Sequence, residues 1–243
     1  EYRFTSKFTA VLGIRFEHIY QDISWKTSLD PIGDKDAFTK VEFLPNATFK
    51  YEVNDKNNLK LAASKSYTLP QYKERAPFQF EEVTQIKFGN PKLNTSTNYN
   101  ADLRWEYFPK SGEVISVTGF GKIIQNPINE VVVASATNDI SYVNTGKQAS
   151  VFGAEFEIRK NIFSLENEKE IDILTNKLSA GFNASYMYSN QDFDRLKVIN
   201  ENNLNVNFTN KEGRLTGASD LILNADVTYR KDFSKTANVL ATI

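Results

Sequence analysis

The sequence contains no cysteine and a single histidine, His18. Without cysteine, neither a disulfide framework nor a cysteine-based metal site can form. One histidine argues against a multi-histidine metal centre and against histidine-based catalysis. The net charge of −1 provides no basic field of the kind that recruits nucleic acid. We therefore expect no metal, no cofactor and no nucleic-acid partner.

The chain also has no run of about 18 apolar residues, the length that a transmembrane helix requires. That absence leaves transmembrane β-strands open, because each strand gives only a weak hydropathy signal. There is no glycine-rich phosphate loop and no zinc-ligand spacing. Glu155 and Glu157 lie two residues apart, but a strand face of mixed charge is typical of a solvated surface. We predict no catalytic residue and no enzyme activity.

The most regular feature of the sequence is the alternation of apolar with polar residues. From Tyr99 every second residue is apolar or aromatic as far as Tyr107, and the residues between them are polar or charged. This period of two is the pattern of a strand with one apolar and one polar face. The pattern predicts an all-β fold of about nine strands, near residues 7–20, 41–52, 58–66, 97–108, 113–124, 148–160, 177–189, 218–231 and from 236 onward.

The predicted connections alternate between short and long. Tight turns rich in Asn, Asp, Gly, Pro and Lys follow the second, fourth and eighth strands. Long gaps of about twenty to thirty residues are expected at 21–40, 67–96, 125–147 and 190–217, and only the gap at 161–176 departs from the alternation. Long loops are uncommon in compact soluble domains, whereas outer-membrane barrels have short periplasmic turns and long extracellular loops. The pattern predicts an antiparallel transmembrane β-barrel.

The charged strand face is then expected to line the barrel lumen, and the apolar face to meet outer-membrane lipid. Aromatic residues near the ends of the predicted strands fit the girdles of such barrels. In the gap at 67–96, exposed aromatic and basic side chains are candidates for ligand binding: Tyr67, Tyr72, Arg75, Phe78 and Phe80. The predicted lumen-facing residues are Arg15, Glu17, Asn98, Asn100, Asp102, Arg104, Glu106 and Glu155.

Four segments of the chain form a recognisable series. The first two are "SYTLPQYKERAPF" and "GNPKLNTSTNYNADLRWEYF", with the Gly89-Asn90-Pro91 turn. The other two are "VISVTGFGKIIQNPI" and "YVNTGKQASVFGAEFEI". Together they resemble the barrel of TonB-dependent outer-membrane receptors, notably those of Bacteroidetes type. From the residues alone, the Gly-Asn-Pro segment is a turn, and Gly153 within a strand indicates a bulge or a close backbone approach.

The resemblance implies a receptor in the outer membrane of a Gram-negative bacterium. It would take up a scarce nutrient (siderophore, cofactor, oligosaccharide or peptide) by active transport coupled to a TonB complex. It further implies a plug domain and a TonB-engaging segment, which residues 1–243 do not contain. Nine strands fall short of the barrel of about 22 strands expected for such transporters. We therefore expect residues 1–243 to be a partial barrel from a larger receptor.

Three alternatives stay open at this point. One is a passive porin or structural barrel without plug or energy coupling. The second is an outer-membrane enzyme with a Ser/His site, for which His18 is the sole candidate base. The third is a soluble all-β binding module.

Overall fold

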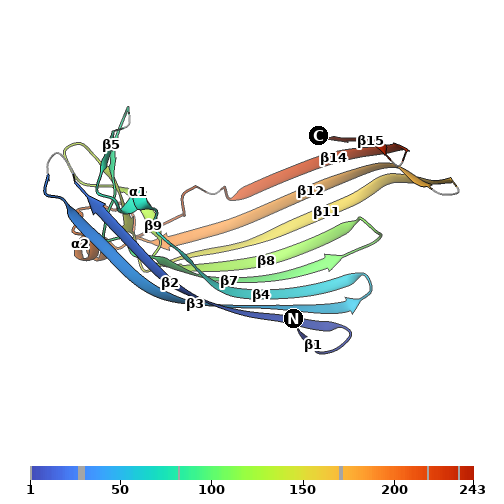
Figure 1. Cartoon of the computed structure of the whole chain (residues 1–243), viewed down its shortest axis with the longest axis horizontal. Helices are drawn as coiled ribbons and strands as arrows, with labels where there is room; N and C mark the ends of the chain where they lie inside the picture. The colour runs from blue at the N-terminus through green and yellow to red at the C-terminus, as the bar shows by residue number, and fades with distance from the viewer. Residues whose placement is uncertain (1, 27–30, 82, 170–171, 218, 235) are drawn as a thin grey trace.

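The computed structural model describes residues 2–26, 31–81, 83–169, 172–217, 219–234 and 236–243. Within them, eleven strands form one curved antiparallel sheet in which each long strand pairs with the next long strand along the chain (Figure 1). Its long strands are β2 (Phe8–Trp25), β3 (Asp34–Asn54), β4 (Asn57–Thr68), β7 (Ser96–Tyr107), β8 (Val114–Gln125), β11 (Gln148–Lys169), β12 (Asp172–Asp192), β14 (Leu221–Ser234) and β15 (Ala237–Thr242). Two short strands, β1 (Tyr2–Arg3) and β13 (Glu212–Gly213), complete it.

The all-β prediction and its nine strands are confirmed by these nine long strands. Two of the hairpins close through the short turns that the sequence indicated. Asn54 accepts a hydrogen bond from the backbone N–H of Lys56 at 3.0 Å. Gly112 has a φ of +75°, a conformation that glycine adopts without a steric penalty.

Two predicted boundaries were wrong. Residues 21–40 are mostly strand, because β2 continues to Trp25 and β3 begins at Asp34. The gap at 161–176 is also mostly strand, because β11 runs to Lys169 and β12 begins at Asp172. Charged residues suggested chain breaks there. A hairpin that projects beyond the membrane has water on both faces, so it needs no apolar row.

The other long gaps are folded segments as well. A second sheet of four strands has the order β5 (Gln79–Glu81), β6 (Ile86–Phe88), β10 (Ile140–Asn144) and β9 (Ile128–Val132). Two helices, α1 (Tyr72–Arg75) and α2 (Arg195–Asn202), lie beside it. All of these elements gather at one end of the long strands, opposite the short turns (Figure 1). They have a small core of their own in Val143, Val198 and Val206.

The strand register gives the large sheet two distinct faces. Residues paired directly across an antiparallel ladder lie on the same face. The register therefore joins the eight predicted lumen residues into one face, here called the polar face: Arg15, Glu17, Asn98, Asn100, Asp102, Arg104, Glu106 and Glu155. The opposite, apolar face includes Leu12, Ile14, Phe16, Leu103, Trp105, Phe152, Phe156 and Phe182.

The packing on the polar face explains why a glycine, Gly153, occurs within strand β11. It pairs regularly with Phe120 on one side and Met187 on the other, so there is no bulge at this residue. A Cβ atom at position 153 would lie 2.3 Å from the Phe120 ring. The close approach expected at this glycine is therefore the packing of an aromatic side chain over the bare backbone.

Candidate functional site

The gap at 67–96 is fixed to the sheet by Arg75, at the end of helix α1. The helix begins with a capping box, in which the Gln71 backbone N–H donates to the Glu74 carboxylate at 2.8 Å. It ends at Ala76, because the residue before Pro77 disfavours helical backbone. One short turn thus suffices to direct the Arg75 side chain back toward β2 and β3.

Arg75 is almost completely buried, with 2% of its surface exposed. Its guanidinium donates to the Gln21 side-chain oxygen at 2.6 Å and to the Pro91 carbonyl at 3.0 Å. It also forms an ion pair with Asp36 and lies over the Phe38 ring, 4.5 Å from the ring centroid. Burial lowers the pKa of the guanidinium from its ordinary value, and the Asp36 carboxylate opposes that shift. Arg75 therefore ties the helix and the Gly-Asn-Pro turn to the ends of β2 and β3.

A cavity of about 410 Å³ lies beside Arg75, at the end of the sheet that carries the second sheet and the helices. That volume is within the usual range of small-molecule sites, roughly 300–1,000 Å³. Lys40 donates to the Thr95 hydroxyl and pairs with Glu42 at 2.7 Å, so the floor of the cavity is polar. The lining residues are Asp36, Phe38, Thr39, Lys40, Arg75, Pro91, Lys92, Leu93, Asn94, Thr95 and Asn126.

The structure brings only one of the five predicted ligand-binding residues to this cavity, namely Arg75. Tyr67 instead donates a hydrogen bond from its hydroxyl to the Glu17 carboxylate on the polar face. Tyr72, Phe78 and Phe80 do not line the cavity, and all three side chains are exposed. Residues 91–95 of the same gap line the cavity, and none of them was among the predicted ligand-binding residues.

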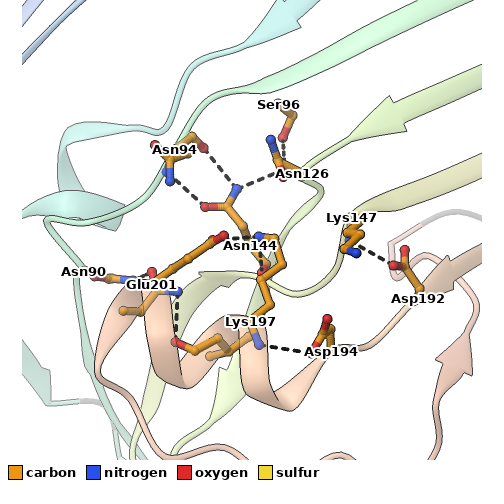
Figure 2. Close-up of polar contacts among 12 residues, drawn as sticks. Asn90, Asn94, Ser96, Asn126, Asn144, Lys147, Asp192, Asp194, Lys197 and Glu201 are labelled. Carbon is orange, nitrogen blue, oxygen red and sulfur yellow. Dashed lines mark hydrogen bonds and ion pairs between the residues drawn. The ribbon is translucent and has the colours of Figure 1, made fainter.

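A cluster of asparagines, of which Asn90, Asn144 and Asn202 are buried, joins the segments beside the cavity (Figure 2). Asn144 is fully buried, and its side-chain oxygen accepts from the Asn94 backbone N–H at 2.9 Å. Its amide nitrogen donates to the carbonyls of Asn94 at 3.0 Å and Asn126 at 2.9 Å. The Asn144 side chain thus hydrogen-bonds the backbone of two separate loops, as a neighbouring strand would. Backbone N–H and carbonyl groups are costly to bury without such partners.

Asn90 extends the asparagine cluster to helix α2. Its amide nitrogen donates to the Tyr142 carbonyl at 2.8 Å and to the Asn202 side-chain oxygen at 2.7 Å. From the same helix, Lys197 donates to the Asn144 carbonyl at 3.3 Å. Four separate segments of the chain therefore meet in one network: 89–96, 126, 142–144 and 197–202.

Two glycines make this approach of the loops possible. A Cβ atom on Gly89 would lie 2.1 Å from the Ala76 carbonyl oxygen, and one on Gly146 would lie 2.1 Å from the Asp192 carbonyl oxygen. Both glycines belong to the motifs that carried the family resemblance. Asn94, Asn126 and Asn202 were not predicted as site residues, because in a chain rich in asparagine nothing in the sequence marks those that join this network.

The polar face below the cavity carries interlocked charges. Glu106 pairs with Lys60 at 2.8 Å and with Arg104 at 3.0 Å, and Arg104 reaches Glu157 at 2.9 Å. Glu17 and Glu42 lie directly opposite each other across β2 and β3, an arrangement that is unfavourable for like charges. Arg15 neutralises Glu17 at 2.9 Å. Glu42 is neutralised by Lys65 at 3.0 Å and by Lys40.

The described residues contain no group of three or more His, Asp or Glu side chains that could hold a metal ion. They also contain no helix of the length and hydropathy needed to cross a membrane. The fold itself defines a class: a curved antiparallel meander with short turns at one end, folded connections at the other, and one apolar and one charged face. These are the properties of the wall of a transmembrane β-barrel.

The family model described as TonB dependent receptor-like, beta-barrel, matches residues 1–241. The chain therefore belongs to the TonB-dependent receptors, which are transport receptors of the Gram-negative outer membrane. Comparison with curated proteins finds no match.

Solved structures share the fold. The siderophore receptor PirA from Pseudomonas aeruginosa has a TM-score of 0.51 at 15% identity, over 95% of this chain and 36% of that one. A double mutant of the Serratia marcescens hemophore receptor HasR, in complex with HasA and heme, has a TM-score of 0.60 at 12% identity, over 97% and 41%. The copper transporter OprC has a TM-score of 0.52 at 9% identity, over 98% and 40%. The chain thus spans about two fifths of these structures.

Proposed function

We propose that residues 1–243 form one segment of the barrel of a receptor that takes up a scarce nutrient by TonB-coupled transport. The family match over residues 1–241 is the observation that carries this proposal. The plug domain, the TonB complex and the nutrient are partners of the whole receptor. The three solved structures are a siderophore receptor, a hemophore receptor and a copper transporter, so they do not favour one substrate class.

We further propose that the polar face lines the lumen and that the cavity beside Arg75 contributes to ligand binding. The cavity has the size of a small-molecule site, and residues from four segments line it. Lys92, Asn94 and Asn126 supply side chains that can contact a ligand. Arg75 has its donors engaged with Gln21, Asp36 and Pro91, so its role is to position the lining segment. Tyr72, Phe78 and Phe80 are proposed as outer contacts above the cavity.

The test is growth and uptake by the source organism with the full-length gene intact, deleted, or present in a strain without TonB. A panel of candidate nutrients under limitation would identify the substrate. We expect deletion of the gene and loss of TonB to abolish the same uptake. Uptake that depends on the gene but persists without TonB would instead establish a passive porin.

A matched pair of variants tests the cavity. Asn94→Ala is expected to weaken binding of the identified nutrient to the full-length receptor by at least fivefold. Asn200→Ala, an exposed position on helix α2, should leave binding unchanged. Equal affinities for both variants and the unaltered receptor would show that the ligand binds elsewhere.

A further inference from the structure

A second cavity, of about 580 Å³, lies where β3 and β4 separate. Its walls include Leu12, Ile14, Ala47, Ala63 and Tyr99, which lie on the apolar face. Leu12 and Ile14 are 69% and 65% exposed, so their large side chains project from the sheet beside the small side chains of the two alanines. We call this cavity the β3–β4 groove.

The β3–β4 groove exists because the hydrogen-bonded ladder between these strands stops. Asn46 pairs with Ser64, and no further β3–β4 pair follows toward the end that carries the second sheet. The neighbouring ladders are continuous at this level, with Ile14 opposite Pro45 and Lys65 opposite Tyr99. Proline has no backbone N–H to donate, so a ladder commonly ends or bulges beside it.

The groove enters the sheet instead of lying on its surface. Gly13, Asn46, Ser64 and Asn100 line it as well, and the register places these four residues on the polar face. Lys65 also lines the groove, and its ammonium group reaches Glu42 of the polar face at 3.0 Å. The groove is therefore a slot between two strands, with apolar walls at the outside and a charged pair at its inner end.

The position of the slot sets what surrounds it. Ser64 is seven residues from Asn57, where β4 leaves the short turn. At about 3.3 Å per residue and a tilt of about 35–45°, this places the slot roughly 16–19 Å above the turn, in the outer half of an apolar band about 25 Å tall. In a Gram-negative outer membrane, the lipid of that outer half is lipopolysaccharide.

We propose that the β3–β4 groove binds one acyl chain of the lipid A moiety of lipopolysaccharide. A flexible acyl chain suits an apolar slot of this kind, because it makes dispersion contacts along both walls. In this arrangement the acyl chain runs along Ala47 and Ala63, and Tyr99 stands at the upper end of the groove. This inference rests on the membrane location of the barrel and on short turns that face the periplasm, and it is independent of which nutrient the receptor transports.

The experiment uses the full-length receptor, extracted from the outer membrane in mild detergent and examined by native mass spectrometry. The unaltered receptor should retain one lipopolysaccharide molecule after stepwise delipidation. Ala63→Phe fills the slot and should reduce the retained fraction at least fivefold. Ala225→Phe makes the same change at an exposed alanine of the apolar face on β14, and it should retain the lipid as the unaltered receptor does.

Equal retention by Ala63→Phe and the unaltered receptor would overturn the proposal, as would retention of phospholipid in place of lipopolysaccharide. A second measurement does not depend on the folding of a variant. Lipid A with a diazirine in one acyl chain is photo-cross-linked to the unaltered receptor, and the adducts are mapped by peptide mass spectrometry. Adducts concentrated at 45–47 and 63–65 support the slot, and adducts spread evenly over the apolar face contradict it.

Discussion

At the scale of single residues, asparagine side chains hydrogen-bond the backbone groups of the connecting segments. In the large sheet, neighbouring strands satisfy the same kind of groups. The Asn144 amide presents a donor and an acceptor in nearly the geometry of a backbone peptide group. It therefore pairs with both backbone groups of Asn94, through hydrogen bonds of 2.9 and 3.0 Å. A shorter or charged side chain cannot provide the same pair. The loops are thereby fixed without a continuous sheet between them.

This pairing predicts the effect of Asn144→Ala in the full-length receptor. The change leaves the Asn94 backbone N–H and carbonyl without their partner, at a cost of about 1–3 kcal/mol for a buried unsatisfied group. The Asn126 carbonyl keeps the hydrogen bond from the Ser96 hydroxyl. We expect faster proteolysis within 89–96 and 126–144, and weaker binding of the nutrient, while the heat-resistant folding of the barrel is kept. Limited proteolysis followed by mass mapping measures the first effect. Proteolysis unchanged from the unaltered receptor would show that Asn144 does not hold the loops.

The same residues show how far sequence reasoning reaches. Gly89 and Asn90 could be placed in a turn, because the Gly-Asn-Pro sequence itself sets the local backbone conformation. The partners of Asn90, Tyr142 and Asn202, lie 52 and 112 residues away along the chain. Such contacts depend on which loops the barrel brings together, and a local pattern does not contain that information. For the same reason Arg75 resembled an exposed ligand contact in the sequence and is buried in the structure.

At the scale of elements, alternation identified the nine long strands, because each must keep one face apolar over the membrane. It failed where that requirement ends. Asp34 and Asp36 belong to β3, and Gln21 and Asp22 belong to β2, although these residues carry no apolar period. Their strand conformation comes from pairing, with Asp22 opposite Ala37 and Ile23 opposite Asp36. Hydrogen-bonded strand pairing stabilises the hairpins beyond the membrane. Alternation of apolar and polar residues does not predict them.

Helix α2 provides a prediction at this scale. Asp194 caps it, and its side chain accepts from the Lys197 backbone N–H at 3.0 Å. Asp194→Ala should destabilise the helix by about 1 kcal/mol, and Asp194→Asn should have little effect, because asparagine is an equally good cap. Hydrogen exchange of the amides in 195–202 measures this. A loss of about 1 kcal/mol corresponds to roughly fivefold faster exchange. Similar exchange in both variants would mean that packing of Val198 governs the helix.

At the scale of the whole molecule, one face of the sheet is suited to water and the other to lipid. The polar face carries acids and bases in alternation, so the charges of Glu42 and Glu106 are balanced within the wall. The apolar face exposes large hydrophobic side chains such as Phe16 at 70%, which water would disfavour and lipid accepts. A soluble sandwich would need to cover that face with a second sheet. In the described residues, the second sheet lies at the end of the strands instead (Figure 1).

This arrangement predicts the orientation of the chain in the membrane. Thiol labelling can measure it, and residues 1–243 contribute no cysteine of their own to the background. Phe80→Cys places a thiol on β5, and Lys110→Cys places one in the short turn after β7; both positions are exposed. With a membrane-impermeant maleimide on intact cells, we expect labelling at position 80 and none at 110, because the folded connections face outward and the short turns face the periplasm. After the outer membrane is made permeable, both positions should react equally. Labelling of position 110 but not 80 on intact cells would show that the barrel has the opposite orientation. The cavity beside Arg75 would then lie at the periplasmic end, where an incoming nutrient could not first encounter it.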